Sequence, residues 1–151
     1  GHAPERAVRE VSSEAMHAAF RVNAVGPMLV LKHGLLLLPK DSPSVFAVLS
    51  ARVGSSGDIG IGGWHSYRGS KAALNQLIHG AAIEMKRTHK QATVVCLHPG
   101  TVETDFTAKY AGRHKTVPAT EAAANLVRVI EGLGPAQTGR FFDYAGREIP
   151  W

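Results

Sequence analysis

Tyr67 and Lys71 are the two residues whose types and spacing most directly suggest chemistry. They are four positions apart, so on a helix their Cβ atoms lie roughly 5–6 Å from each other on one face. An ammonium beside a phenol favours the phenolate, and a pair of this kind can pass a proton to a substrate oxygen. A unit charge 4 Å away supplies about 1 kcal/mol in water and about 4 kcal/mol at an effective dielectric near 20, so the pair requires a closed site. Taken alone, the spacing is more typical of a surface ring packed on a lysine stem.

The helix that must carry this pair is predicted from about residue 66 to residue 88. Its expected apolar stripe is Ala73, Leu77, Ala81 and Met85, which recur at helical spacing. A glycine-rich loop precedes the helix, so the pair is expected in its first turns, next to that loop.

The other expected elements alternate between helices and short apolar strands. A long helix capped by Ser12 and bent at Gly26-Pro27 leads to a strand at 44–50, and a second strand follows at 92–97. The closing segment, 139–151, is predicted as one more strand and a turn. This alternation is typical of a parallel α/β sheet. The first predicted element is a helix, so no predicted strand precedes the strand at 44–50. We therefore expect that strand to lack a neighbour on one side.

Length and composition limit the class of protein. The sequence has 151 residues, of which 44% are hydrophobic and 19% charged, which suits one soluble domain. No apolar stretch reaches the roughly 20 residues that cross a bilayer, and no secretory signal is visible, so no membrane partner is expected. The single cysteine, Cys96, excludes a disulfide within the chain and fits a reducing compartment, so a cytoplasmic location is expected.

The formal net charge of +5 does not by itself indicate a nucleic-acid partner. The densest basic run, Lys86, Arg87, His89 and Lys90, closes the helix predicted above, where positive charge offsets the negative end of the helix dipole. No aromatic residues alternate with these cations. The eight histidines do not have the spacing of a metal site, so no metal is expected.

Several separate segments, in the same order along the chain, resemble the short-chain dehydrogenase/reductase superfamily. They are FRVNAVGP (20–27), LSARVGS (49–55), GGWHSY (62–67), SYRGSKAALNQ (66–76) and HPGTVETDF (98–106). The closing GRFFDYAGREIPW (139–151), together with SARVGS and YRGSKAALN, is similar to the C-factor and sniffer-like carbonyl reductase branch of that superfamily.

The resemblance implies a role for each matching residue. Tyr67 matches the general acid/base, and Lys71 matches the lysine that lowers the pKa of the phenol and binds the nicotinamide ribose. Asn23 matches the asparagine that holds the water of a proton relay, although an asparagine here could equally bond a backbone group at the proline bend.

The same resemblance implies an NADP or NAD cofactor. The segment that lies over the nicotinamide in the family is matched here by Pro99, Gly100, Val102 and Thr104. The same residues are also typical of a turn that ends a strand. The residue that would choose between NADP and NAD follows a strand that these residues do not include.

Two departures from the family pattern stand out. The serine that binds the substrate carbonyl falls at Ala51, which has no hydroxyl. Ser50, at the carboxyl end of the strand, and Ser55, in the loop, are the candidate replacements, although serines in such loops are commonly turn residues. The glycine-rich turn that seats a pyrophosphate is also missing, and the glycines of GDIGIGG (57–63) do not have its spacing.

The expected fold is therefore α/β, the carboxyl-terminal part of a doubly wound parallel-sheet (Rossmann-type) fold without the upstream cofactor-binding strands. Residues 1–151 are expected to form a single, incomplete domain that carries the catalytic part. The expected function is an NAD(P)-dependent oxidoreductase acting on a small-molecule carbonyl or alcohol, as a homo-oligomer. The alternative is a non-catalytic truncated reductase, a C-factor-like signalling or binding module. Trp64, His65, Phe106 and Tyr110 are expected to line the substrate pocket.

Overall fold

A computed structural model describes residues 3–103 and 116–151. It has a parallel three-stranded sheet in the order β1-β2-β3. The strands are β1 (Ser44–Leu49), β2 (Ala92–His98) and β3 (Phe141–Asp143). The helices are α1 (Ser13–Phe20), α2 (Gly26–Gly34), α3 (His65–Met85) and α5 (Ala119–Glu131). The predicted parallel α/β class is confirmed.

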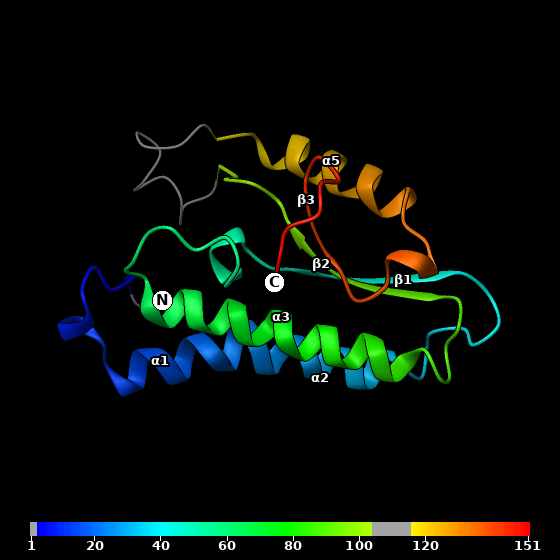
Figure 1. Cartoon of the computed structure of the whole chain (residues 1–151), viewed down its shortest axis with the longest axis horizontal. Helices are drawn as coiled ribbons and strands as arrows, with labels where there is room; N and C mark the ends of the chain where they lie inside the picture. The colour runs from blue at the N-terminus through cyan, green and yellow to red at the C-terminus, as the bar shows by residue number, and fades with distance from the viewer. Residues whose placement is uncertain (1–2, 104–115) are drawn as a thin grey trace.

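The sheet lies between two helical layers. The helices α1, α2 and α3 run along one side of it, and α5 lies on the other (Figure 1). On the first side, Leu74 and Ile78 of α3 pack against Val94 and Cys96 of β2. On the second side, Leu126 of α5 packs with residues of β2 and β3. Residues of one strand therefore alternate between two apolar layers, as expected for a strand buried on both faces.

The first long helix begins where the sequence predicts but bends differently. The Ala15 amide donates to the Ser12 hydroxyl oxygen at 3.1 Å, which confirms the cap. Between α1 and α2 the backbone forms a five-residue π-helix, η2 (Arg21–Val25), in which the Gly26 amide bonds to the Arg21 carbonyl. Pro27 has no amide hydrogen and cannot continue an ordinary turn, so the distortion lies just before it. Asn23 lies within this turn, and π-turns are frequent at functional sites.

The buried side of α3 differs from the predicted stripe. Leu74, Ile78 and Ala82 are buried together with Met85, whereas Leu77 is 40% exposed. Apolar residues occupy two adjacent rows of this helix, about 100° apart. The prediction is confirmed for Met85 and for Ala81, which packs against the core, but it is wrong for Leu77, because packing against the sheet buries the row of Leu74 and Ile78.

The amino-terminal segment caps the first turn of α3. The Glu5 carboxylate accepts hydrogen bonds from the Ser66 hydroxyl and, at 3.2 Å, from the Ser66 amide. Burial alone would raise the pKa of Glu5, but these hydrogen bonds outweigh burial and lower it. Trp64, just before the helix, has a left-handed backbone (φ 56°), and its amide bonds to the Glu5 carbonyl at 2.6 Å.

The 3-10 turn after β1, η3 (Arg52–Gly54), packs directly on α3. A Cβ atom added at Gly54 would lie 2.8 Å from the carbonyl carbon and Cβ of Lys71, and 3.0 Å from the amide nitrogen of Ala72. Only glycine allows two backbones to come this close. The contact sets the position of Lys71 relative to the end of β1.

Two further features concern only residues 3–103 and 116–151. No helix there is both long and apolar enough to cross a membrane. Nor does that part of the chain bring together three or more His, Cys, Asp or Glu side chains in a group that could hold a metal ion.

We predict that Gly54→Ala destabilises the protein by about 1–3 kcal/mol, because the added methyl group overpacks the contact between η3 and α3. Urea unfolding measures this as a lower transition midpoint. Gly60→Ala is the matched control, because a Cβ atom at Gly60 meets nothing within 4 Å. Equal midpoints for the two variants would contradict the close contact.

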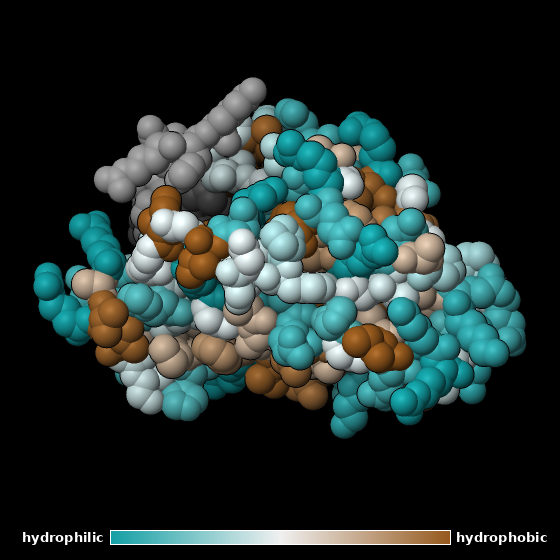
Figure 2. Space-filling model, viewed as in Figure 1, coloured by the Kyte–Doolittle hydropathy of each residue, from teal (hydrophilic) through white to brown (hydrophobic). Residues whose placement is uncertain are grey.

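We predict that residues 1–151 alone self-associate or require a partner, in line with the expected homo-oligomer. In the described part of the chain β1 pairs only with β2, so the backbone groups of its other edge are open, and open edges pair with other chains. Exposed apolar side chains of η2 and α2, among them Val22 and Val30, add to this tendency, and Figure 2 shows brown patches along the edge of the molecule where these helices lie.

Sedimentation velocity tests this prediction. Leu49, at the end of β1, is 58% exposed, and Leu49→Lys should reduce association, since charged edge residues prevent strand pairing. Leu37→Lys, in the turn after α2, is the control. A stable monomer for the parent chain is the contrary result.

Candidate functional site

Tyr67 and Lys71 lie in the first two turns of α3, at the carboxyl end of β1. The Lys71 Nζ atom donates to the Leu49 carbonyl oxygen at 2.9 Å and lies 5.9 Å from the centre of the Tyr67 ring. The two residues therefore share one face of the helix, as their spacing predicts. Ligands of open α/β sheets bind outside the carboxyl ends of the strands, which is where this pair is held.

Burial dominates the electrostatics of the pair. Burial raises the pKa of the Tyr67 phenol and lowers the pKa of the Lys71 ammonium. The resemblance implies the opposite direction for the phenol, namely a pKa lowered by lysine. In this structure the ammonium lies near the ring and bonds to a backbone carbonyl. Tyr67 is therefore protonated at neutral pH and suited to donating a proton.

Trp64 packs beside Tyr67 at the amino-terminal end of the helix. The two rings lie edge to face, with their centres 5.9 Å apart and their planes at 74°. A tryptophan with a left-handed backbone is uncommon and is held by its surroundings, here by the hydrogen bond from its amide to Glu5. Phe106 and Tyr110, the other aromatic residues expected at the pocket, lie outside the described residues.

Hydrogen bonds through Ser70 connect Asn23 to the helical turn that carries Tyr67. The Asn23 Nδ2 atom donates to the Ser70 hydroxyl at 3.0 Å, and that hydroxyl donates to the Tyr67 carbonyl oxygen at 2.8 Å. The amide nitrogen thus bonds to a side chain of α3 and not to a backbone group at the proline bend. The π-turn of the first helix is in this way tied to the turn that carries Tyr67.

Both candidate serines use their hydroxyl groups in hydrogen bonds within the protein. The Ser50 hydroxyl donates to Asn75 Oδ1 at 2.6 Å, and Ser50 is only 4% exposed. The Ser55 hydroxyl donates to the carbonyl of Pro150 and accepts from the Asp58 amide. In this structure both hydroxyls donate to protein acceptors, and a role of Ser50 or Ser55 as the donor to a substrate carbonyl stays a prediction. The loop with Gly57 is likewise bound to the chain end, because the Gly57 amide donates to the Trp151 carbonyl at 2.7 Å.

The Pro99-Gly100 turn ends β2 where the sequence predicts a turn. Gly100 has a φ of 80°, and a Cβ atom there would lie 3.0 Å from the Tyr144 ring, so glycine is required twice over. Beyond it, Val102 forms a parallel bridge with Val117. Thr104, the last residue expected in this segment, lies outside the described residues.

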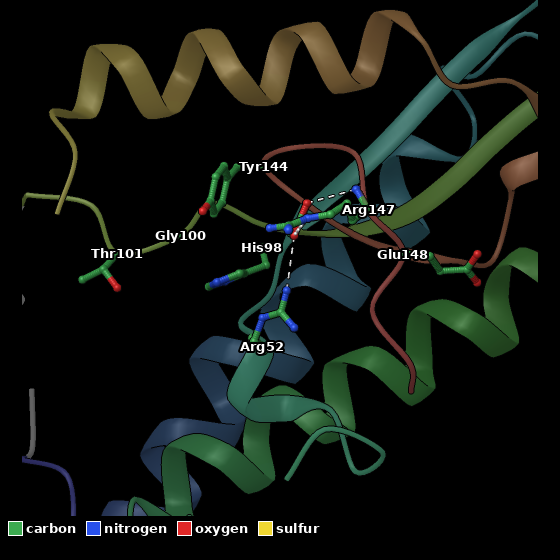
Figure 3. A pocket seen from close by; sticks show the side chains of 8 residues that line it. Arg52, His98, Gly100, Thr101, Tyr144, Arg147 and Glu148 are labelled. Atoms are coloured by element: carbon green, nitrogen blue, oxygen red, sulfur yellow. Dashed lines mark hydrogen bonds and ion pairs between the residues drawn. The ribbon is translucent and has the colours of Figure 1, made fainter. Parts of the chain in front are cut away.

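A polar cavity of about 600 Å³ lies at the carboxyl ends of all three strands (Figure 3). Its walls include Arg52, which follows β1, His98, which ends β2, and Asp143, which ends β3. The turn after β3 contributes Tyr144 and Arg147, and the remaining lining residues are Gly100, Thr101 and Glu148. Sequence reasoning missed this group, although each member lies at or just after the end of a predicted strand.

Asp143 is the fully buried centre of this group. Arg52 Nη2 lies 3.3 Å and Arg147 Nε 3.0 Å from its Oδ2 atom. The Ala145 and Arg147 amides donate to Oδ1 at 2.9 and 3.0 Å. Burial alone would raise the pKa of Asp143, but these amides and the Arg147 guanidinium outweigh it and lower the pKa. The carboxylate is therefore ionised and holds both arginines in place.

His98 is neutral at physiological pH. Burial, followed by the charge of Arg52, lowers its pKa to about 4, although the Asp143 charge acts in the opposite direction. Its Nδ1 atom is buried and has no hydrogen-bond partner. A buried polar atom without a hydrogen-bond partner is energetically costly, which favours any movement of the ring that gives Nδ1 a partner.

A family model described as Enoyl-(Acyl carrier protein) reductase matches residues 1–139. Over 145 residues the chain is 37% identical to C-signal of Myxococcus xanthus, with 96% of this chain and 84% of that protein covered. Among solved structures, the carbonyl reductase Sniffer of D. melanogaster has a TM-score of 0.87 at 27% identity. The NADPH-bound carbonyl reductase from chicken fatty liver has a TM-score of 0.84 at 25% identity.

The chain spans only part of the length of the solved relatives that it matches. Both solved structures are matched over 100% of this chain but only 63% of their own length. The parallel sheet with an open β1 edge agrees with the carboxyl-terminal part of the doubly wound fold, without its upstream strands. The chain belongs to the short-chain dehydrogenase/reductase superfamily, in the branch of C-signal and the Sniffer-like carbonyl reductases.

Proposed function

We propose that residues 1–151 are the catalytic part of one short-chain dehydrogenase/reductase domain that interconverts a carbonyl compound and an alcohol with NADP or NAD. The observation that carries this proposal is the placement of Tyr67 and Lys71 on one face of α3, with Lys71 bonded to the last carbonyl of β1. The similarity to carbonyl reductases supports the same reaction class. It does not favour a non-catalytic signalling module.

The residues present fit one end of a nicotinamide cofactor. Lys71 offers an ammonium to a ribose hydroxyl, and the glycine turn at Gly100 allows backbone groups near Pro99 and Val102 to approach a carboxamide. Thr104 is proposed for the same segment. No glycine-rich phosphate turn occurs in the sequence, so the pyrophosphate and adenosine must be held by other residues.

Tyr67 is proposed to act as the general acid in the reducing direction. A bound NADPH or NADH supplies the hydride that forms the new C–H bond. As negative charge develops on the substrate oxygen, the Tyr67 hydroxyl gives up its proton to form the alcohol O–H bond. The phenolate left behind is stabilised by the Lys71 ammonium, and Asn23 is proposed to hold the water through which the proton returns.

We predict that Tyr67→Phe lowers the turnover rate by about 100-fold to 10,000-fold, the usual contribution of a general acid, while cofactor affinity stays unchanged. NADPH oxidation with a carbonyl substrate measures the rate, and nicotinamide fluorescence measures the affinity. Both are measured on the complete protein. Equal rates for parent and variant would rule out this role.

We predict that Lys71→Met weakens NADPH binding by about tenfold, as expected for the loss of one charge-assisted hydrogen bond, and also lowers the rate. Lys86→Met removes the same charge at the exposed far end of α3 and is the control. A loss confined to the rate would contradict contact between Lys71 and the ribose.

We predict opposite effects for the two residues at the end of β1. Ala51→Ser restores a hydroxyl donor and should raise kcat by about tenfold or more, because one well-placed donor contributes roughly 100-fold. Ser50→Ala should lower the unfolding free energy by about 1–3 kcal/mol, because it leaves Asn75 Oδ1 without its buried donor, and kcat should change little. A large fall in kcat with unchanged stability would instead assign the donor role to Ser50.

A further inference from the structure

The cavity at the strand ends presents hydrogen-bond donors but few free acceptors. The Oδ1 atom of Asp143 accepts from two backbone amides, and its Oδ2 atom accepts from Arg52 and Arg147. A carboxylate has about four acceptor positions, so Asp143 has none left for a ligand. It serves to fix the two guanidinium groups.

The arginines keep donors that Asp143 does not use. A guanidinium has five N–H donors, and Arg147 bonds to Asp143 through Nε, so its two terminal nitrogens remain available on a side chain that is 71% exposed. Arg52 is shared between Asp143 and Asp58, which lies 3.0 Å from its Nη1 atom. Glu148, the other carboxylate of the wall, is 2.9 Å from Arg140. The carboxylates of Asp143, Asp58 and Glu148 are thus each paired with an arginine.

His98 adds a group that is buried and unsatisfied. Its Nδ1 atom faces no hydrogen-bond partner, and its side chain lies in the wall of the cavity between Arg52 and Tyr144 (Figure 3). Once a turn of the ring exposes Nδ1 to the cavity, its N–H tautomer can donate to an oxygen placed beside the arginines. One ligand oxygen group would therefore satisfy the imidazole and the free guanidinium nitrogens together.

The cavity is joined to the reacting pair by the short turn η3. Arg52, its first residue, lines the cavity, and Gly54, its last residue, touches Lys71. The cavity and the reacting pair therefore lie at the two ends of one three-residue turn, which is the span that a substrate reaching from Tyr67 to the arginines has to cover.

We propose that the cavity binds a carboxylate carried by the carbonyl substrate, through Arg147, Arg52 and His98. This proposal rests on the proposed function, because it names the substrate class of the same site. A planar carboxylate matches the fork of a guanidinium. Selection comes from the donors, because a neutral amide keeps one acceptor oxygen but places N–H donors where the second carboxylate oxygen would face the guanidinium.

The test compares 4-carboxybenzaldehyde with its neutral analogue 4-formylbenzamide on the complete protein. We expect a KM about tenfold lower for the acid, which corresponds to about 1.4 kcal/mol. Arg147→Gln should remove this preference and leave the amide unaffected, and Arg147→Lys should keep part of it. Arg87→Gln, at the exposed end of α3, removes one positive charge far from the cavity and should change neither KM.

Calorimetry without cofactor and the ¹⁵N resonances of His98 provide a readout independent of turnover. The acid, but not the amide, should shift the His98 resonances and bind more weakly to Arg147→Gln. Equal affinity for acid and amide, or a preference that survives Arg147→Gln, overturns the carboxylate site even if both aldehydes are reduced. A preference that depends on Arg147 without any turnover supports the carboxylate site and counts against the proposed reductase activity.

Discussion

The close contact between Gly54 and the backbone of α3 is the constraint on which the rest of the site depends. A glycine is required there because any Cβ atom would meet Lys71 at 2.8 Å. Through this contact the end of β1, the turn η3 and the first turns of α3 form one unit. The Lys71 ammonium can then reach the Leu49 carbonyl, and Arg52 is left facing the ends of β2 and β3. Both the proton-donating pair and the arginine wall are therefore positioned by the same backbone approach.

Burial determines the charge states on either side of that contact. Burial raises the pKa of the Tyr67 phenol still further above neutral pH, and burial beside the Arg52 guanidinium lowers the pKa of His98, which is therefore neutral. Asp143 is fully buried but ionised, because two backbone amides and two arginines replace the hydrogen bonds that water would otherwise donate. The open edge of β1 also bears on burial, because protein packed against that edge would bury Tyr67 and Lys71 more deeply. The electrostatic attraction between the Lys71 ammonium and a Tyr67 phenolate would then be stronger.

The hydrogen bonds around α3 show how remote segments hold its first turns. Glu5 caps the helix, and Asn23 reaches Ser70 from the π-turn of the preceding helix. The chain end also contributes, because the carbonyls of Pro150 and Trp151 accept from the loop after β1. Segments far apart in the sequence therefore converge on the helix that carries the candidate chemistry.

The sequence by itself determined the parallel α/β class, the spacing of Tyr67 and Lys71 and the turn at Pro99-Gly100, because each depends on residues close together in the chain. Only the tertiary structure decided which row of α3 is buried, since packing on the sheet selects Leu74, Ile78 and Ala82 over their neighbours.

Tertiary structure also decided the direction of Ser50, whose side chain shares the face of β1 that packs on α3 and so bonds to Asn75. The grouping of Arg52, His98 and Asp143 could not be predicted from local patterns for the same physical reason. The carboxyl ends of the three parallel strands meet only when the strands lie side by side in the sheet. The residue pattern within one strand does not specify which strands are its neighbours.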